Sequence, residues 1–390
     1  MVKFIKFSLL ISLSIIISIL QDTKKILEKL FFKFKTAKLR IIKKIRGEKM
    51  ATIKDIAKYT GVSPTTVSNV IHGRDSKVSP ETKEKVKKAL VELDYTADMG
   101  ARLLAKNGSK IIGFIIQDNE AVVEEFFDNP YHGELIQAVE SNIKKAGYFM
   151  MFHRVSSFEE GAKLAEMWHL EGLIVSGTSV NDVAKWQKKV TVPVVFIDSY
   201  ATNLEEPFLN VGIADKQGAY EMTTYLLNLG HKKIGFIAKG ETESAWQGVD
   251  YERSKGVIRA MKQVDLSPTL IPIPVTYNDN RQFVTDNLME TIKTCTVIFC
   301  ASDLLAVQLV SALYKKNINV PRDISIVSFD GTPYAKYATP QITCMKQDVS
   351  KKAEAIMTLV LKGIETKNTM SESIYLKTTL VEGASVKKLT

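Results

Sequence analysis

Residues 52–71 read TIKDIAKYTGVSPTTVSNVI and contain the start and end signals of two short helices. Thr52 and Asp55 have the spacing of a capping box, in which the threonine caps the helix and the acidic side chain bonds back to it. An apolar stripe follows at helical spacing. Gly61 should end this helix, because glycine readily adopts the left-handed backbone found after helix C-termini.

The second helix of this stretch is expected to start at Ser63 and to run to about Ile71. Pro64 follows the serine cap, and its missing N–H costs nothing in a first helical turn. Val62 and Val67 have the spacing of a hydrophobic staple around the cap. Two short helices joined through a glycine turn make a helix-turn-helix, whose second helix has the size to enter a DNA major groove.

A third helix is expected after Ser79, which repeats the serine-cap and proline pattern with Pro80. Its apolar side chains share one face: Val86, Ala89, Leu90 and Leu93. The three apolar stripes can pack on each other, so the sequence predicts an all-α headpiece over residues 50–96.

The outward residues of the second helix are those that can read bases: Thr65, Thr66, Ser68 and Asn69. Asparagine can bond both N6 and N7 of adenine, and threonine offers a hydroxyl and a methyl group. Nearby His72, Arg74 and Lys77 suit phosphate contacts, which position a protein without specifying sequence. The alternative is a small three-helix domain with a polar surface and no function.

Residues 52–104 resemble the headpiece of the LacI/GalR family of transcriptional regulators. The motifs that match are Ile53-Lys-Asp-Ile-Ala57, Gly61-Val-Ser63, Thr66-Val-Ser68, Val70, Val78-Ser79, and Thr82 through Leu93-Asp-Tyr95. The resemblance implies that Pro64, Thr65 and Asn69 choose the operator bases. Since Pro64 has no side-chain donor, specificity should rest mainly on Thr65 and Asn69. The full expected DNA-binding set is Thr52, Ser63, Pro64, Thr65, Thr66, Ser68, Asn69, His72, Arg74, Lys77, Ala101 and Leu104.

The segment 97–110 resembles the family's hinge helix, which folds on operator DNA. Ala101-Arg-Leu-Leu-Ala-Lys106 matches it, and Leu104 falls where the family inserts a leucine into the minor groove. Such a wedge unstacks a base step and bends the duplex. Residues 96–100 lack the usual proline and add Gly100, which costs about 1 kcal/mol in a helix interior. We therefore expect a hinge that depends more on DNA for its order; a plain amphipathic linker helix is the alternative.

From Lys110 onward, apolar runs alternate with amphipathic helical segments. The runs that read as buried strands are 111–116, 148–152, 172–176, 192–198, 234–237, 296–299 and 325–330. This alternation predicts an α/β region with two doubly wound parallel sheets. No G-x-G-x-x-G or G-x-x-x-x-G-K motif is present, which disfavours a nucleotide-dependent enzyme.

The same region resembles the type I periplasmic-binding-protein-like core of the family. The matching stretches include Asn129-Pro-Tyr131, Val211-Gly-Ile-Ala-Asp215, Leu229-Gly-His-Lys-Lys-Ile234, Arg253-Ser-Lys-Gly256 and Lys346-Gln-Asp348. The resemblance implies an effector held between two subdomains that are linked by three crossovers. We expect 111–211 plus about 342–375 in the first subdomain, and 212–341 plus about 376–390 in the second.

Ligands of open α/β sheets bind at the carboxyl ends of strands, where Ser176, Asp198 and Asp330 lie. The resemblance places six residues in the effector cleft: Gln117, Ser176 and Asp198 from the first subdomain, and Arg253, Ser302 and Asp330 from the second. An arginine with two carboxylates suits hydroxyl-rich ligands such as sugars.

Each of these assignments has a structural alternative. Asp330 can be a turn residue and Arg253 part of a surface ion pair. Ser176 and Ser302 stand where asparagine is usual, so a particular sugar or nucleoside is not indicated. Trp246 and Tyr277 can stack on a ring or simply pack.

The first 49 residues account for the whole formal net charge of +10, because they hold 13 Lys/Arg and 3 Asp/Glu. Lys3 and Lys6 precede an apolar run at 7–20, shorter than the roughly 20 residues that span a bilayer. The interpretations are a signal anchor, an interfacial amphipathic arm, or sequence outside the natural protein. We favour the third, because Met50 resembles a natural start and 46–49 can be encoded as a purine-rich ribosome-binding site.

The cysteines and histidines predict neither a disulfide framework nor a metal site. Cys295, Cys300 and Cys344 lie in apolar or small-residue surroundings and read as reduced core thiols of an intracellular protein. The five histidines are scattered without ligand spacing. No metal or other cofactor is expected, and no nucleophile–base pair indicates an enzyme.

The sequence therefore predicts a cytoplasmic, sequence-specific repressor of carbohydrate or related metabolic genes. Its expected partners are double-stranded operator DNA with a pseudo-palindromic site, a sugar-like effector, and further copies of itself in a homodimer or tetramer. A protein corepressor serves some members of the family. The main alternative is a membrane-tethered or exported solute-binding protein, which the apolar N-terminus and the shared core fold motivate.

Overall fold

The computed structural model describes residues 51–71, 73, 76, 78–96, 108–117, 126–200, 208–240, 242–273, 286–366 and 371–389. The chain divides between Leu104 and Ala105 into two compact units, called the headpiece and the core below. Several predictions concern residues outside the described ones: the extension 1–49, most of the hinge, His72, Arg74, Lys77, Ala101, Leu104 and Tyr277.

The described residues of the headpiece form three helices, α2 (Ile53–Thr60), α3 (Pro64–Ile71) and α4 (Pro80–Glu92). The capping box at Thr52 and Asp55 is confirmed, since the threonine side chain accepts from the Asp55 N–H and the aspartate accepts from the Thr52 N–H. Gly61 has a φ of 68°, so it ends α2 in the left-handed conformation as predicted. Each helix thus begins or ends where its own sequence dictates.

A small apolar core holds the three helices together. Ile56, Val67 and Val86 are fully buried, and each comes from a different helix. Val62 packs against the same cluster, in agreement with the staple predicted around the second helix start. The headpiece therefore folds around a few side chains, so single apolar contacts matter there.

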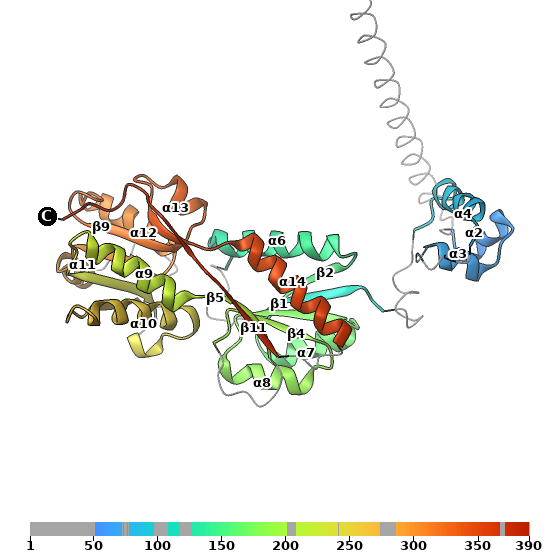
Figure 1. Cartoon of the computed structure of the whole chain (residues 1–390), viewed down its shortest axis with the longest axis horizontal. Coiled ribbons are helices and arrows are strands. Elements are labelled where there is room, and N and C mark those ends of the chain that lie inside the picture. Colours follow the sequence, from blue (N-terminus) through green and yellow to red (C-terminus); the bar gives the residue numbers. More distant parts are fainter. Residues whose placement is uncertain are drawn as a thin grey trace, which may run out of the picture. The chain divides into compact units, whose positions relative to one another are not determined.

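The core has two lobes, each built on a six-stranded sheet (Figure 1). The first sheet has the order β11-β5-β4-β3-β1-β2, and all of its pairings are parallel. Its strands are β1 (Ile111–Gln117), β2 (Phe149–Val155), β3 (Gly172–Ser176), β4 (Val194–Ile197), β5 (Leu209–Ile213) and β11 (Glu372–Leu376).

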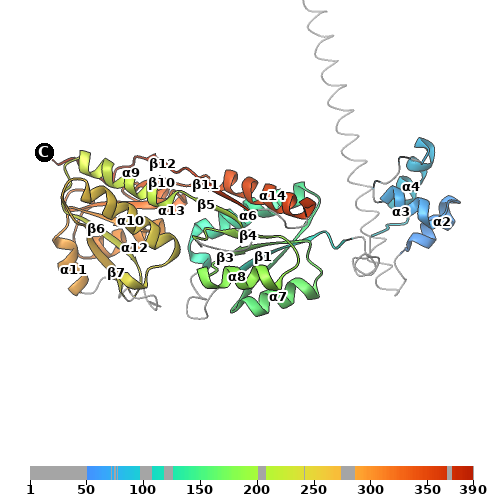
Figure 2. The same cartoon turned by 60° about the horizontal axis from the view of Figure 1, so that its bottom comes forward.

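Helices cover both faces of this first sheet (Figures 1 and 2). One face carries α6 (Pro130–Lys145) and α14 (Val349–Thr366), which pack against each other. The opposite face carries α7 (Phe158–Met167) and α8 (Val180–Lys189). With both faces covered, the strands are nearly continuous apolar runs, which is why the sequence predicted them.

The second sheet has the order β12-β10-β9-β8-β6-β7 and is parallel except for β12. Its strands are β6 (Ile234–Lys239), β7 (Thr269–Ile273), β8 (Val297–Cys300), β9 (Ser325–Asp330), β10 (Thr343–Lys346) and β12 (Thr379–Val381). The helices of this lobe are α9 (Asp215–Asn228), α10 (Gly248–Lys262), α11 (Asp286–Lys293), α12 (Asp303–Lys315) and α13 (Pro333–Tyr337), with the short 3₁₀ helix η2 (Glu243–Ala245). The expected pair of doubly wound sheets is confirmed.

Three crossovers join the lobes, after β5, after β10 and after β11. The first one comes after Ile213 and not after 211, because β5 stays in the first sheet to Ile213. The second one also differs from the sequence prediction. β10 pairs with β9 in the second sheet, so the chain returns to the first lobe only after Lys346, and not at about residue 342. Residues 347–348 therefore lie between the two lobes, next to the candidate site described below.

Candidate functional site

The core contains a cleft of about 590 Å³ whose walls come from both lobes. All six predicted effector residues line it: Gln117, Ser176, Asp198, Arg253, Ser302 and Asp330. The strand ends of β3, β4 and β9 supply Ser176, Asp198 and Asp330, as open α/β sheets lead one to expect. The structure therefore brings these side chains together, although they are spread over more than 200 positions of the chain.

The wall from the second lobe is organised by Arg253 on α10. Its Nε donates to Asp215 Oδ1 at 2.6 Å, its Nη2 donates to Asp330 Oδ1 at 3.2 Å, and its Nη1 donates to the Ala301 carbonyl. The guanidinium also lies 3.9 Å from the ring centre of Phe329. These contacts fix a planar cation in one orientation at the cleft.

Burial and charge act against each other at this cluster. Burial raises the pKa of Asp215 to about 6, although the Arg253 charge opposes the shift, and burial raises the pKa of Asp330 as well. Burial alone would lower the pKa of Arg253, but the carboxylates of Asp215 and Asp330 outweigh it and the pKa is raised. The arginine is thus permanently charged and is ion-paired with two carboxylates.

The wall from the first lobe is organised by Asp198, which follows β4. Lys352 Nζ on α14 lies 2.7 Å from Asp198 Oδ1 and 2.6 Å from Oδ2. The same ammonium donates to Tyr131 Oη at 2.7 Å and to Gln347 Oε1 at 3.2 Å. Gln347 Nε2 in turn donates to Asp330 Oδ1 at 2.7 Å. A chain of hydrogen bonds therefore joins the two walls through the crossover at 347–348.

Both cleft aspartates have unusual backbone geometry. Asp198 has a φ of 52° and Asp330 a φ of 111°, values that L-residues rarely adopt. Such conformations persist only where the surroundings hold them, and they concentrate at functional sites. The pair therefore supports a functional role over the alternative that Asp330 is only a turn residue.

Two of the predicted effector residues, Gln117 and Ser302, also have structural bonds of their own. Gln117 accepts from Trp186 Nε1 at 2.8 Å and donates to Asp182 Oδ2 at 2.7 Å. Ser302 caps α12, and its Oγ accepts from the Leu305 N–H. Gln117 keeps one N–H of its side-chain amide and Ser302 keeps its hydroxyl proton, because the hydrogen bonds above do not use them. Each can therefore still donate to a ligand, from a side chain held in a fixed direction.

Sequence reasoning missed Lys352 and Asp215 as members of this site. Lys352 occurs in an apolar helix face, where it is fully buried, and Asp215 is an acidic residue in a first helical turn. Trp246, considered for ring stacking, is part of the second lobe's core and packs edge-on against Phe236 at 5.4 Å. Its packing alternative is therefore the better description.

The start of α3 is exposed at the cap Ser63 and at Pro64 and Thr65. Ser68 and Asn69, further along the helix, are half-buried. The Thr66 hydroxyl lies 2.9 Å from Ser63 Oγ, so the cap engages it. In α2, the Thr52 hydroxyl donates to Asp55 Oδ2. The assignment of Thr65 and Asn69 as base-reading residues stays a prediction.

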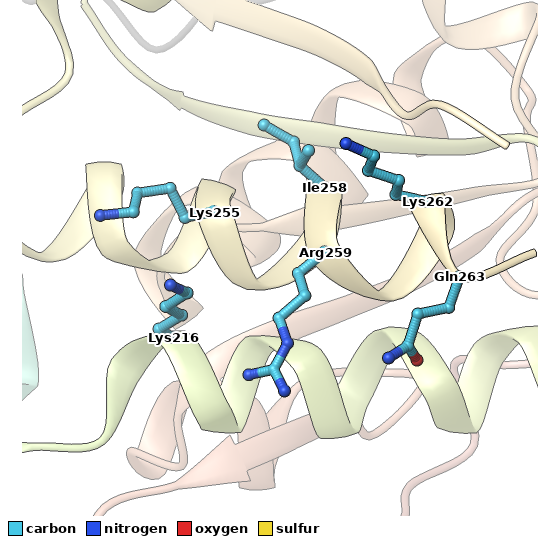
Figure 3. A pocket seen from close by; sticks show the side chains of 6 residues that line it. All are labelled: Lys216, Lys255, Ile258, Arg259, Lys262 and Gln263. Atoms are coloured by element: carbon cyan, nitrogen blue, oxygen red, sulfur yellow. The ribbon is translucent and has the colours of Figure 1, made fainter. Parts of the chain in front are cut away.

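A second, shallower groove of about 400 Å³ lies between α9 and α10 (Figure 3). Four cations line it together with Ile258 and Gln263: Lys216, Lys255, Arg259 and Lys262. Lys255 pairs with Glu252, and Arg259 lies over the Tyr220 ring at 4.9 Å. These charges are at the surface, unlike Arg253 and Lys352 in the cleft.

Within the described ranges, no helix has the length and apolarity needed to cross a bilayer. The apolar run at 7–20 lies outside those ranges.

Comparison with protein-family models gives two matches. Residues 52–98 match the bacterial regulatory proteins of the lacI family, and residues 223–386 match a periplasmic binding protein-like domain. The two matches fall on the headpiece and on the core.

Curated relatives match over nearly their whole length. The HTH-type transcriptional repressor PurR of Pasteurella multocida (strain Pm70) is 31% identical over 350 residues, covering 87% of this chain and 99% of the relative. The HTH-type transcriptional regulator MalR of Clostridium butyricum is 30% identical over 341 residues, covering 85% and 97%.

Solved structures with the same fold include a lac repressor dimer bound to operator and the anti-inducer ONPF, with a TM-score of 0.73 and 23% identity. The match covers 87% of this chain and 100% of the lac repressor chain. A transcriptional regulator CelR–cellobiose complex has a TM-score of 0.63 and 22% identity, covering 86% and 99%.

Proposed function

Because the chain belongs to the LacI family of bacterial regulatory proteins and is a DNA-binding transcriptional repressor, we propose that an uncharged, hydroxyl-rich effector in the core cleft controls it. The regulated genes would then serve carbohydrate or related metabolism. The repressor would work as a dimer on a pseudo-palindromic operator, which agrees with the operator-bound lac repressor dimer among its structural neighbours.

The observation that carries the effector proposal is the set of bonds that the cleft leaves open. Arg253 uses three of its five N–H groups on protein acceptors, so two donors remain. Within the described part of the chain, the protein's own hydrogen bonds to the Asp330 carboxylate all end on Oδ1, which leaves Oδ2 as an acceptor. A hydroxyl both donates and accepts, so neighbouring hydroxyls of a sugar match this arrangement.

The roles of the site residues follow from this geometry. Arg253 and Asp330 would hold the effector from the second lobe, with Ser302 donating one more hydrogen bond. Asp198 would accept from the first lobe, next to Ser176, while Gln117 would shape the wall through its bonds to Asp182 and Trp186. The effector would thereby bias how the two lobes sit, which couples two sites if its affinity differs between the two arrangements.

The test is an operator titration with purified protein. Duplex DNA from upstream of its own gene is labelled, and anisotropy is measured at fixed salt with cellobiose, maltose, ribose or no addition. We expect binding to the operator that at least one sugar changes about tenfold or more, a typical allosteric coupling. Operator binding that no sugar alters, combined with no sugar binding to the core, would contradict the proposed effector class.

A further inference from the structure

Lys352 occupies a position on the buried face of α14 where an apolar side chain is usual. It lies on the buried face of α14 with Ile356, Val360 and Gly363, and it is fully buried. Burying an ammonium costs several kcal/mol even when it is paired, and an apolar residue of similar volume is often as stable or more so. Stability alone therefore does not account for a lysine at this position.

What Lys352 does is neutralise the cleft wall. Asp198 is the one carboxylate among the described residues that line the cleft from the first lobe. Lys352 approaches both of its oxygens at 2.7 Å or less, and Tyr131 Oη donates to Oδ2 at 3.2 Å. The carboxylate keeps lone pairs for a ligand hydroxyl, but its charge is already balanced.

Lys352 also sets the direction of Gln347. Because the ammonium can only donate, it holds the Gln347 carbonyl toward the first lobe, and the amide N–H₂ then faces Asp330. The Lys352 ammonium thus holds Asp198 directly on one wall and Asp330 through Gln347 on the other. This link spans the crossover after β10.

We propose that Lys352 is a specificity-determining residue that makes the cleft select an uncharged hydroxyl ligand and reject its ammonium analogue. The proposal rests on the effector class proposed above and names the residue that enforces it. Without the lysine, Asp198 would present a net negative charge to the ligand. Without Asp198, the lysine would present a positive one.

The experiment uses the full chain and three sets of matched sugars: glucose, glucosamine and glucuronate; galactose, galactosamine and galacturonate; mannose, mannosamine and mannuronate. Affinities are measured by calorimetry at one pH and salt concentration for wild type, Lys352→Gln and Asp198→Asn. Lys351→Gln is the matched control, because Lys351 is the next residue of α14 and its side chain is 72% exposed. Circular dichroism checks that each variant folds.

We expect wild type and Lys351→Gln to prefer the neutral member of a set. Lys352→Gln should shift the preference toward the ammonium sugar, and Asp198→Asn toward the uronate, each by about tenfold or more, since a charge near a buried site acts at low dielectric. Either variant suffices if the other fails to fold. The shifts are ratios within a set, so they appear even if the physiological effector is another sugar.

Three results would overturn the proposal: a wild type that prefers a charged member, ratios that neither variant changes, or no gained binding of a charged sugar in either variant. Failure of the proposed function looks different. It would appear as wild-type protein that binds no sugar and whose operator binding no sugar alters, while Lys352→Gln still gains binding of an ammonium sugar or Asp198→Asn of a uronate.

Discussion

In the headpiece, the hydrogen bonds that fix the helix starts join residues three positions apart: Thr52 to Asp55, Ser63 to Thr66 and Ser79 to Thr82. In the cleft, Lys352 bonds residues 154 and 221 positions away, and Arg253 bonds a partner 77 positions away. The DNA-reading unit is therefore specified by local sequence. The candidate effector site exists only when both lobes have folded.

This difference predicts that mutations in the two regions affect separate properties. All three tryptophans lie in the core, at 168, 186 and 246, so tryptophan fluorescence follows the unfolding of the core alone. Circular dichroism follows the helices of both units. The two signals together therefore separate unfolding of the headpiece from unfolding of the core.

Arg253→Met should have the largest effect. It leaves Asp215 and Asp330 buried without their cation, and breaking such a pair costs about 3–5 kcal/mol. Urea unfolding followed by tryptophan fluorescence should show this loss, together with loss of sugar binding. Arg259→Met, on the exposed side of the same helix, is the control and should change little (Figure 3). Equal losses for both variants would contradict the cleft assignment.

Ile56→Ala should destabilise only the headpiece. Ile56 is fully buried in its small core, and truncating such a side chain costs about 2–5 kcal/mol. DNA binding should fall, and an early thermal transition should appear in circular dichroism, while the core midpoint by fluorescence stays the same. A core midpoint that moves with the headpiece would break the distinction between local and long-range units.

Asp303→Asn should alter the pH dependence of core stability. Burial, with a smaller contribution from Asp330, raises the pKa of Asp303 to about 7, against about 4 in an unfolded chain. Between these values the folded state holds a proton that the unfolded chain has released. The free energy of unfolding therefore falls as pH rises through this window, by up to about 1.4 kcal/mol per pH unit.

Urea midpoints at a series of pH values from 4 to 7 measure this slope. The Asn variant should have a flatter profile than wild type, and Glu166→Gln, at an exposed position, should keep the wild-type profile. Unfolding of the headpiece should not show this decrease in stability with rising pH, because none of its described carboxylates is buried. Parallel profiles for wild type and Asp303→Asn would show that Asp303 is ionised throughout.

The same contrast explains what could be predicted from the sequence. Helix caps are local signals, so α2 and α3 were predicted with their bounds. Strands covered on both faces are continuous apolar runs, so β3 and β9 were also predicted residue for residue. β11 alternates between half-buried and exposed positions at a sheet edge and gave no apolar run.

The candidate site was predicted only in part. The strand-end position pointed to Ser176, Asp198 and Asp330, and the family resemblance supplied Gln117, Arg253 and Ser302. Lys352 was missed because a lysine in a helix ordinarily faces solvent, and its partners Tyr131 and Asp198 are remote in sequence. The signal that could have found it is its spacing, four residues before Ile356 on the buried face of α14.

Sequence-specific DNA binding is tested by a selection of random-sequence duplexes by the purified protein at one fixed salt concentration, followed by sequencing. We expect an inverted repeat with two half-sites, and Asn69→Ala should lose discrimination at one base pair per half-site, by about 1–3 kcal/mol. Its binding to random DNA, which phosphate contacts dominate, should change little. If wild type and Asn69→Ala both retain duplexes that share no consensus sequence, the protein is not a sequence-specific repressor.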